Sequence, residues 1–109
     1  MDLRLDGKVA VVTGASKGIG RCVAEFLARE GCDVVITART AAPLEAAAEK
    51  IAADTGRAVL PLAGDMSVTE DVQRCVDATL EQFGYIDILV TCAGSPPGEL
   101  PAQVTRMSM

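Results

Sequence analysis

The sequence predicts an α/β fold built around a parallel sheet. Short apolar runs, typical of buried strands, alternate regularly with longer stretches whose apolar residues recur at helical spacing. Three glycines lie between the first strand-like run and the first helix-like stretch. Regular strand–helix alternation implies right-handed crossovers, and such crossovers join parallel strands.

The first two strand–helix pairs are expected between residues 9 and 56. Residues 9–12 are continuously apolar, as in a strand buried on both faces. The first helix ends at Gly31, and its apolar residues at helical spacing are Ile19, Val23, Phe26 and Leu27. Residues 34–37 predict the second strand. The second helix begins at Pro43, where a missing N–H is harmless, and ends at Gly56, and its apolar stripe is Leu44, Ala47, Ala48 and Ile51.

The third and fourth strands are expected at residues 58–62 and 86–90. Pro61 cannot donate to a sheet ladder, so the third strand should lie at an edge. Ser67 and Glu70 have the spacing of a capping box, which predicts the start of a third helix that stops at Gly84.

A glycine loop after the first strand predicts the strand order 3-2-1-4. The expected fold is therefore a partial doubly wound (Rossmann) sheet of four strands and three helices, truncated after the fourth strand. Helices one and two should cover one face and helix three the other. Residues 1–94 would form this unit and residues 95–109 an irregular tail. The fourth strand would be an open edge, so self-association through this edge and the uncovered sheet face is expected.

Composition narrows the possible partners and locations. The 109 residues allow one small domain, and the net charge of −5 argues against nucleic acid. No apolar run approaches the roughly 20 residues that a membrane helix needs. The four cysteines show no C-x-x-C spacing and there is no histidine, which argues against a zinc site. Reduced thiols in a cytoplasmic protein are the expectation.

The glycine loop is the main candidate for a binding site. Gly14 allows a tight turn, Gly18 allows close approach to a phosphate, and Gly20 lets the helix pack closely. Amide groups near Gly18 and Ile19 would face a pyrophosphate at the positive end of the helix. The spacing is G-x-x-x-G-x-G, and it lacks the Gly-Lys-Ser/Thr ending of a P-loop. The alternative is a glycine-rich turn without a ligand.

Residues 13–20 closely resemble the glycine motif of short-chain dehydrogenases/reductases, in particular of members similar to 3-oxoacyl-carrier-protein reductases. Asp65 and Met66 match the acidic position after strand three, which the resemblance implies is an adenine contact. Residues 86–90 followed by Ala93-Gly94 resemble the strand-four signature, so the resemblance covers about residues 5–94. The implied cofactor-binding residues are Gly14, Ser16, Lys17, Gly18, Ile19, Gly20, Arg39, Asp65, Met66, Cys92, Ala93 and Gly94.

Two departures from the family pattern bear on function. Thr91-Cys92 replaces the usual asparagine pair, and a thiol cannot donate and accept as an amide does, so weaker cofactor binding is expected. Cys92 is interpreted as a small apolar filler in preference to a reactive thiol. The family's catalytic Ser, Tyr-x-x-x-Lys and Asn have no counterpart, since the single tyrosine, Tyr85, has Leu89 four residues on. No catalytic residue is assigned.

The residues after the second strand favour NADP over NAD. Proteins that prefer NAD carry an acidic residue there, and this chain has Ala38 followed by Arg39. An arginine can bind a 2′-phosphate with charge-assisted hydrogen bonds, and Lys17 adds a second cation.

The sequence therefore indicates the NADP(H)-binding N-terminal part of a short-chain dehydrogenase/reductase that acts on a carbonyl/alcohol pair, inactive as this chain alone. The alternative is a non-catalytic nucleotide-binding module or a partner that completes its sheet against another chain. The sequence assigns no substrate.

Overall fold

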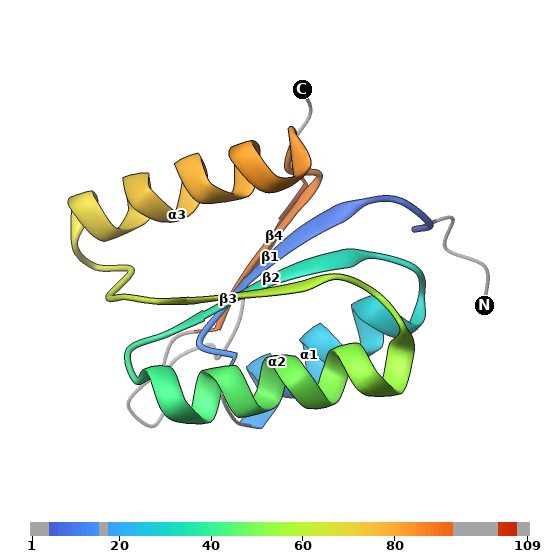
Figure 1. Cartoon of the computed structure of the whole chain (residues 1–109). Helices are drawn as coiled ribbons and strands as arrows, with labels where there is room; N and C mark the ends of the chain where they lie inside the picture. The colour runs from blue at the N-terminus through green and yellow to red at the C-terminus, as the bar shows by residue number, and fades with distance from the viewer. Residues whose placement is uncertain (1–4, 16–17, 93–102, 107–109) are drawn as a thin grey trace.

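The computed structural model describes residues 5–15, 18–92 and 103–106, which form a sheet covered by helices (Figure 1). The strands are β1 (Val9–Thr13), β2 (Asp33–Ala38), β3 (Val59–Ala63), β4 (Ile88–Thr91) and β5 (Gln103–Arg106). The helices are α1 (Gly18–Arg29), α2 (Ala41–Thr55) and α3 (Thr69–Phe83). The sheet order is β3-β2-β1-β4-β5.

The first four strands are parallel and follow the predicted order. Val12 of β1 lies level with Ile36 of β2 on one side and with Val90 of β4 on the other. Pro61 lies level with Ile36 in β3, the outermost strand of the described sheet. Its missing N–H therefore breaks no ladder bond, and the edge position predicted from proline is confirmed.

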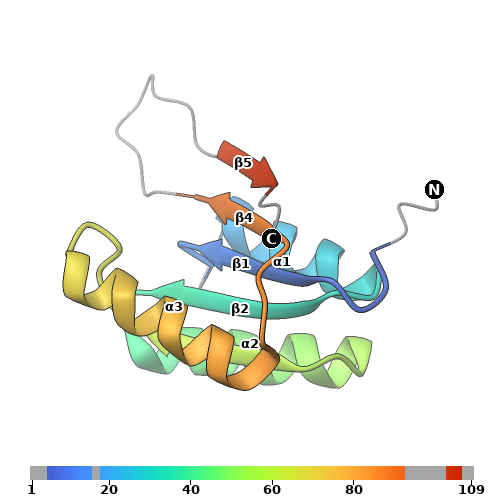
Figure 2. The same ribbon diagram turned by 90° about the horizontal axis from the view of Figure 1, so that it is seen from above.

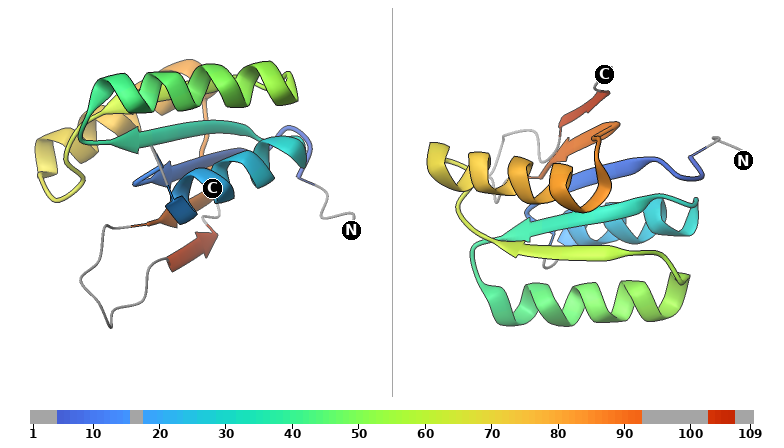
Figure 3. Two further views of the ribbon diagram at one scale, coloured as in Figure 1. Left: turned by 90° about the horizontal axis from the view of Figure 1, so that it is seen from below. Right: turned by 45° about the horizontal axis from the view of Figure 1, so that its top comes forward.

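The helices divide between the two faces as predicted. Helices α1 and α2 cover one face and α3 crosses the other (Figures 1, 2 and 3). Along β1 the buried side chains alternate between two clusters: Val12 packs with the α1 and α2 side, and Val11 packs with Cys75 of α3. Strands covered on both faces need apolar residues at consecutive positions, which explains the continuous run at residues 9–12.

Helix α2 follows its predicted stripe, whereas α1 follows its own only at Leu27, which is buried, and Val23, which packs against the core. The buried residues of α2 are those expected: Leu44, Ala47, Ala48 and Ile51. The buried residues of α1 are Gly20, Ala24, Leu27 and Ala28. Ile19 and Phe26 are instead 54% and 49% exposed, so the predicted apolar stripe is wrong at these two positions. Small residues such as Ala24 and Ala28 let α1 approach the sheet closely, and Ile19 and Phe26 fall on its exposed side.

The predicted capping box at the start of α3 is also wrong. The N-cap residue is Val68, and no side chain caps this helix. The backbone N–H and the hydroxyl of Ser67 both donate to Oδ1 of Asp65, at 2.9 and 2.7 Å. A capping serine would accept from a helix N–H, but the Ser67 hydroxyl instead donates to a nearby carboxylate, which stabilises the loop before α3.

The expected irregular tail contains a strand. β5 pairs antiparallel with β4, with Thr105 level with Leu89 (Figure 2). The open N–H and C=O groups of β4 recruit it, since an unpaired edge is a template for another strand. β4 is therefore not the edge that the sequence predicted. Residues 95–102 and 107–109 of the expected tail lie outside the described residues.

Candidate functional site

Gly14 begins the loop between β1 and α1 in a conformation and at a distance that only glycine allows. Its φ is +65°, and a Cβ built there would lie 1.7 Å from the carbonyl oxygen of Cys92. The backbone just after β4 thus lies directly against the turn. The next amide, of Ala15, donates to the carbonyl of Thr37 at 3.0 Å, which joins the loop to β2 as well.

The start of α1 packs closely on the glycine loop and is open at Gly18. A Cβ at Gly20 would lie 2.2 Å from the Gly14 carbonyl oxygen, so this glycine lets the first turn of the helix rest on the loop. Gly18, with φ +67°, has no described atom within 4 Å of an added Cβ, and Ile19 is exposed. The first amides of a helix lack partners within it and carry the positive end of its dipole. Ser16 and Lys17 lie outside the described residues.

Cys92 acts here through its backbone. Its N–H donates to the carbonyl oxygen of Thr13 at 3.2 Å and to Oγ1 of Thr13 at 3.1 Å. Its side chain is 5% exposed within the core cluster, and burial raises the pKa of the thiol. A buried neutral thiol matches the apolar filler of the sequence interpretation and is a poor nucleophile. Ala93 and Gly94 lie outside the described residues.

Arg39 and Asp65 follow β2 and β3 at the same edge of the sheet. The two hydrogen bonds from Ser67 are the main cause that lowers the pKa of the Asp65 carboxyl, and the Arg39 charge lowers it further. Asp65 is thus an ionised acceptor at neutral pH. Arg39 is exposed, and no ion pair among the described residues includes it. Met66 is half-buried and packs against the core on the α3 side.

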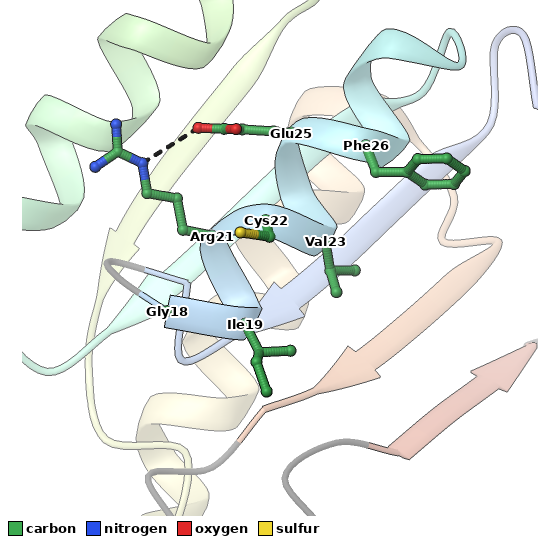
Figure 4. Close-up of a pocket in the computed structure, with 7 residues that line it drawn as sticks. All are labelled: Gly18, Ile19, Arg21, Cys22, Val23, Glu25 and Phe26. Carbon is green, nitrogen blue, oxygen red and sulfur yellow. Dashed lines mark hydrogen bonds and ion pairs between the residues drawn. The ribbon is translucent and has the colours of Figure 1, made fainter.

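A shallow depression of about 620 Å³ runs along the outer side of α1 (Figure 4). Ile19, Val23 and Phe26 lie on one side of the helix there, and the ion pair between Arg21 and Glu25 lies on the other. The depression begins at Gly18, so it adjoins the N-terminal end of the helix. Its apolar lining suits a packing surface better than a phosphate.

The only tyrosine lies away from this edge. Tyr85 precedes β4, and its hydroxyl donates to the carbonyl oxygen of Gly7 ahead of β1. Both positions are at the amino ends of their strands, opposite the glycine loop. Tyr85 therefore holds two chain segments together and is not placed for proton transfer at the candidate site.

Two residues that hold the candidate site in place were not expected from the sequence. Thr13 accepts the Cys92 amide twice, and Asp71 of α3 accepts the Asp65 amide at 2.8 Å. Thr13 has a sequence signal, since a threonine directly before the glycine loop has a hydroxyl at the strand end. The Asp71 contact spans a loop and a helix start, and local pattern does not reveal it.

The described residues contain no helix that is both long and apolar enough to cross a membrane. Within the same part of the chain, no group of three or more His, Cys, Asp or Glu side chains could hold a metal ion.

Parallel strands in the order 3-2-1-4, with a glycine loop after β1 and helices on both faces, define the class as a partial Rossmann fold. The chain belongs to the short-chain dehydrogenase/reductase family, because the family model described as short chain dehydrogenase matches residues 8–108.

The relatives are reductases and dehydrogenases of several kinds. Peroxisomal 2,4-dienoyl-CoA reductase of Mus musculus is 44% identical over 89 residues, covering 82% of this chain and 30% of that protein. Glycine betaine reductase ATRR of Emericella nidulans is 49% identical over 90 residues, covering 83% of this chain and 7% of that protein. These activities do not single out the 3-oxoacyl-carrier-protein reductases.

Solved structures agree with the fold. L-Sorbose reductase from Gluconobacter frateurii, complexed with NADPH and L-sorbose, matches with a TM-score of 0.86 and 41% identity, over 92% of this chain and 38% of that one. A metagenomic short-chain oxidoreductase in complex with NADP matches with a TM-score of 0.72 and 38% identity, over 77% of this chain and 38% of that one. This chain spans 30% of the length of the mouse reductase.

Proposed function

We propose that this chain binds NADP(H) at the carboxyl edge of its sheet, as the N-terminal part of a short-chain oxidoreductase. One observation carries the proposal: the ends of the four parallel strands bring together the glycine loop, Arg39, Asp65 and the Cys92 backbone. Ligands of open α/β sheets bind at this edge. Relatives of the same fold were solved with NADPH and with NADP.

The pyrophosphate would lie against the start of α1. The open side of Gly18 leaves room for phosphate oxygens, and the unpartnered amides of Gly18 and Ile19 would donate to them. Ser16 and Lys17 belong to the proposed site because of their places in the loop. The Gly14–Cys92 contact would keep the loop in shape, so the Cys92 backbone supports the site even though its side chain is not an amide.

The adenosine end would lie between the ends of β2 and β3. Arg39 would bind the 2′-phosphate, because its guanidinium has no ion-pair partner among the described residues and no acidic residue stands at Ala38. The ionised Asp65 would accept from the adenine amino group beside Met66. Ala93 and Gly94 complete the proposed set at the end of β4.

Binding without turnover is the second part of the proposal. When bound, the nicotinamide would exchange a hydride with a carbonyl/alcohol carbon, and that reaction is proposed only for a longer protein of this family. The single tyrosine of this chain is engaged at the opposite edge of the sheet, which supports the proposal that the chain alone does not move the accompanying proton.

The proposal is tested by titrating NADPH and NADH and following the nicotinamide fluorescence. We expect the chain to bind NADPH more tightly than NADH, by about ten- to a hundredfold for one charge-assisted contact. Arg39→Ser should remove this preference and leave NADH affinity unchanged. Arg29→Ser, which changes the same charge at the far end of α1, should alter neither. A folded chain that binds neither dinucleotide, or an Arg39→Ser variant that keeps the preference, refutes the proposal.

Self-association also stays a proposal. The large apolar side chains that are most exposed in the described part of the chain belong to α1, at Ile19 and Phe26, and not to the sheet. The exposed side of α1 is therefore the surface to test for contact with a second copy of this chain. Light scattering should show a monomer for Phe26→Lys if the wild type associates.

Cytoplasmic location is likewise proposed, and the four unpaired cysteines support it.

A further inference from the structure

The loop after β3 is fixed at both of its sides. Gly64 donates its N–H to the carbonyl oxygen of Ala38 at 2.9 Å, which holds the loop to the end of β2. On the other side, a Cβ at Gly64 would meet the Cβ of Asp71 at 3.4 Å, and the Asp65 N–H donates to Oδ2 of Asp71 at 2.8 Å. The loop that carries Asp65 is thus held between β2 and the first turn of α3.

The Asp71 carboxylate is itself held in place. Its second oxygen, Oδ1, accepts from Arg74 at 3.0 Å, and the Asp71 side chain is only 22% exposed. Asp71 is the third residue of α3, where the positive end of the helix dipole favours a carboxylate. One oxygen is therefore committed to Arg74, and the other is free to receive the loop amide.

Two anchors together orient the Asp65 carboxylate. Asp71 holds the backbone N–H of Asp65, and Ser67 donates twice to Asp65 Oδ1. The carbonyl oxygen of Asp65 accepts the Val68 N–H at 2.9 Å, which links the same residue to the N-cap of α3. Both Ser67 bonds fall on Oδ1, so the other carboxylate oxygen is left to face a ligand.

We infer that Asp71 is a positioning residue for the adenine end of the dinucleotide, because it holds the Asp65 backbone where the Asp65 carboxylate and Met66 meet the base. The inference rests on the proposed function. Asp71 touches no ligand in this scheme and acts only through Asp65. A purely helix-stabilising role predicts something different, since any acceptor-free replacement that keeps α3 folded would then keep the affinity.

The test measures NADPH and NADH affinities of the full chain by calorimetry for three replacements. Asp71→Ala removes the acceptor and should weaken both dinucleotides by about five- to tenfold, leaving their ratio unchanged. Asp71→Asn keeps an acceptor oxygen for the Asp65 amide and should recover most of the affinity. Asp77→Ala is the matched control on the same helix, where Asp77 accepts from Gln73 at 2.9 Å, and it should bind as the wild type does.

Urea unfolding of every variant accompanies the titrations, and Asp71→Leu, which also lacks an acceptor, replaces Asp71→Ala if the alanine variant does not fold. The inference is overturned if a folded Asp71→Ala or Asp71→Leu chain binds NADPH as tightly as the wild type, or if Asp71→Asn binds as weakly as Asp71→Ala. Wild-type chain that binds neither dinucleotide overturns the proposed function and the inference with it. Wild-type binding with unchanged variants overturns the inference alone.

Discussion

Replacing Gly14 by alanine should destabilise the whole domain, because Gly14 is in contact with the backbone of Cys92, just after β4. The new Cβ would lie 1.7 Å from the Cys92 carbonyl oxygen, far inside van der Waals contact, and the backbone would have to hold φ near +65°. Neither partner can give easily, since the obstructing atom is backbone and its residue is hydrogen-bonded to Thr13. The strain can be relieved only by moving β4 away from β1.

The expected loss in the free energy of unfolding of Gly14→Ala has two contributions. The left-handed backbone costs an L-residue about 1–2 kcal/mol. Displacing Cys92 weakens its two hydrogen bonds to Thr13, at about 0.5–1.5 kcal/mol each. The free energy of unfolding should therefore fall by about 2–5 kcal/mol, a large part of the roughly 5–15 kcal/mol typical of a small domain.

Urea denaturation followed by far-ultraviolet circular dichroism measures this loss, and two other glycines provide the controls. Gly56, the C-cap of α2 with φ +73°, has no described atom within 4 Å of an added Cβ, so Gly56→Ala should cost only the backbone contribution of about 1–2 kcal/mol. Gly18→Ala should cost the same in stability and abolish NADPH binding, because its open side would receive the pyrophosphate. A Gly14→Ala chain no less stable than Gly56→Ala would refute the reasoning.

Three further outcomes are expected. Ser67→Ala should raise the pKa of Asp65 toward its ordinary value in a carboxyl-detected NMR titration. Because the pKa of Asp65 is lower in the folded than in the unfolded chain, its ionisation stabilises the fold above the unfolded pKa. That stabilisation is lost as pH falls through the folded pKa. In Ser67→Ala the folded pKa is higher, so the loss should occur at higher pH than in the wild type. Tyr85→Phe should cost about 0.5–1.5 kcal/mol in urea unfolding without changing NADPH affinity; a loss of binding would contradict the assignment of Tyr85 to the opposite edge. Ellman's reagent should modify the exposed Cys22 rapidly and the three buried thiols, Cys32, Cys75 and Cys92, only on unfolding. Burial raises the pKa of all three buried thiols, to about 11 for Cys32.

The features predicted from sequence are those that main-chain chemistry imposes. Pro61 placed β3 at the edge because a residue without an N–H cannot serve a central strand, and the sheet order agrees. The turn after β1 was predicted from Gly14 and Gly20, because both approaches to backbone atoms exclude a side chain. These constraints act within a few residues or at one position, so a single sequence carries them.

The predictions that failed depend on a partner chosen by the tertiary structure. The Ser67 hydroxyl could accept from a helix N–H as a cap or donate to Asp65, and the local pattern does not say which hydrogen bond forms. Phe26 has helical spacing with other apolar residues, but the narrow gap between α1 and the sheet admits Ala24 and Ala28 instead. β5 exists because β4 has an open edge, and its four residues have no strong pattern of their own.

The contact between Gly14 and Cys92 also sets an order of events during synthesis. The glycine motif leaves the ribosome early, yet Cys92, whose carbonyl lies against Gly14 and whose amide bonds Thr13, follows β4 and is made 78 residues later. Until β4 inserts beside β1, the nascent loop is held by the Ala15 bond to β2 but lacks its contact with Cys92. If the chain binds NADP(H) as proposed, a growing chain would gain its full binding loop only once β4 is in place.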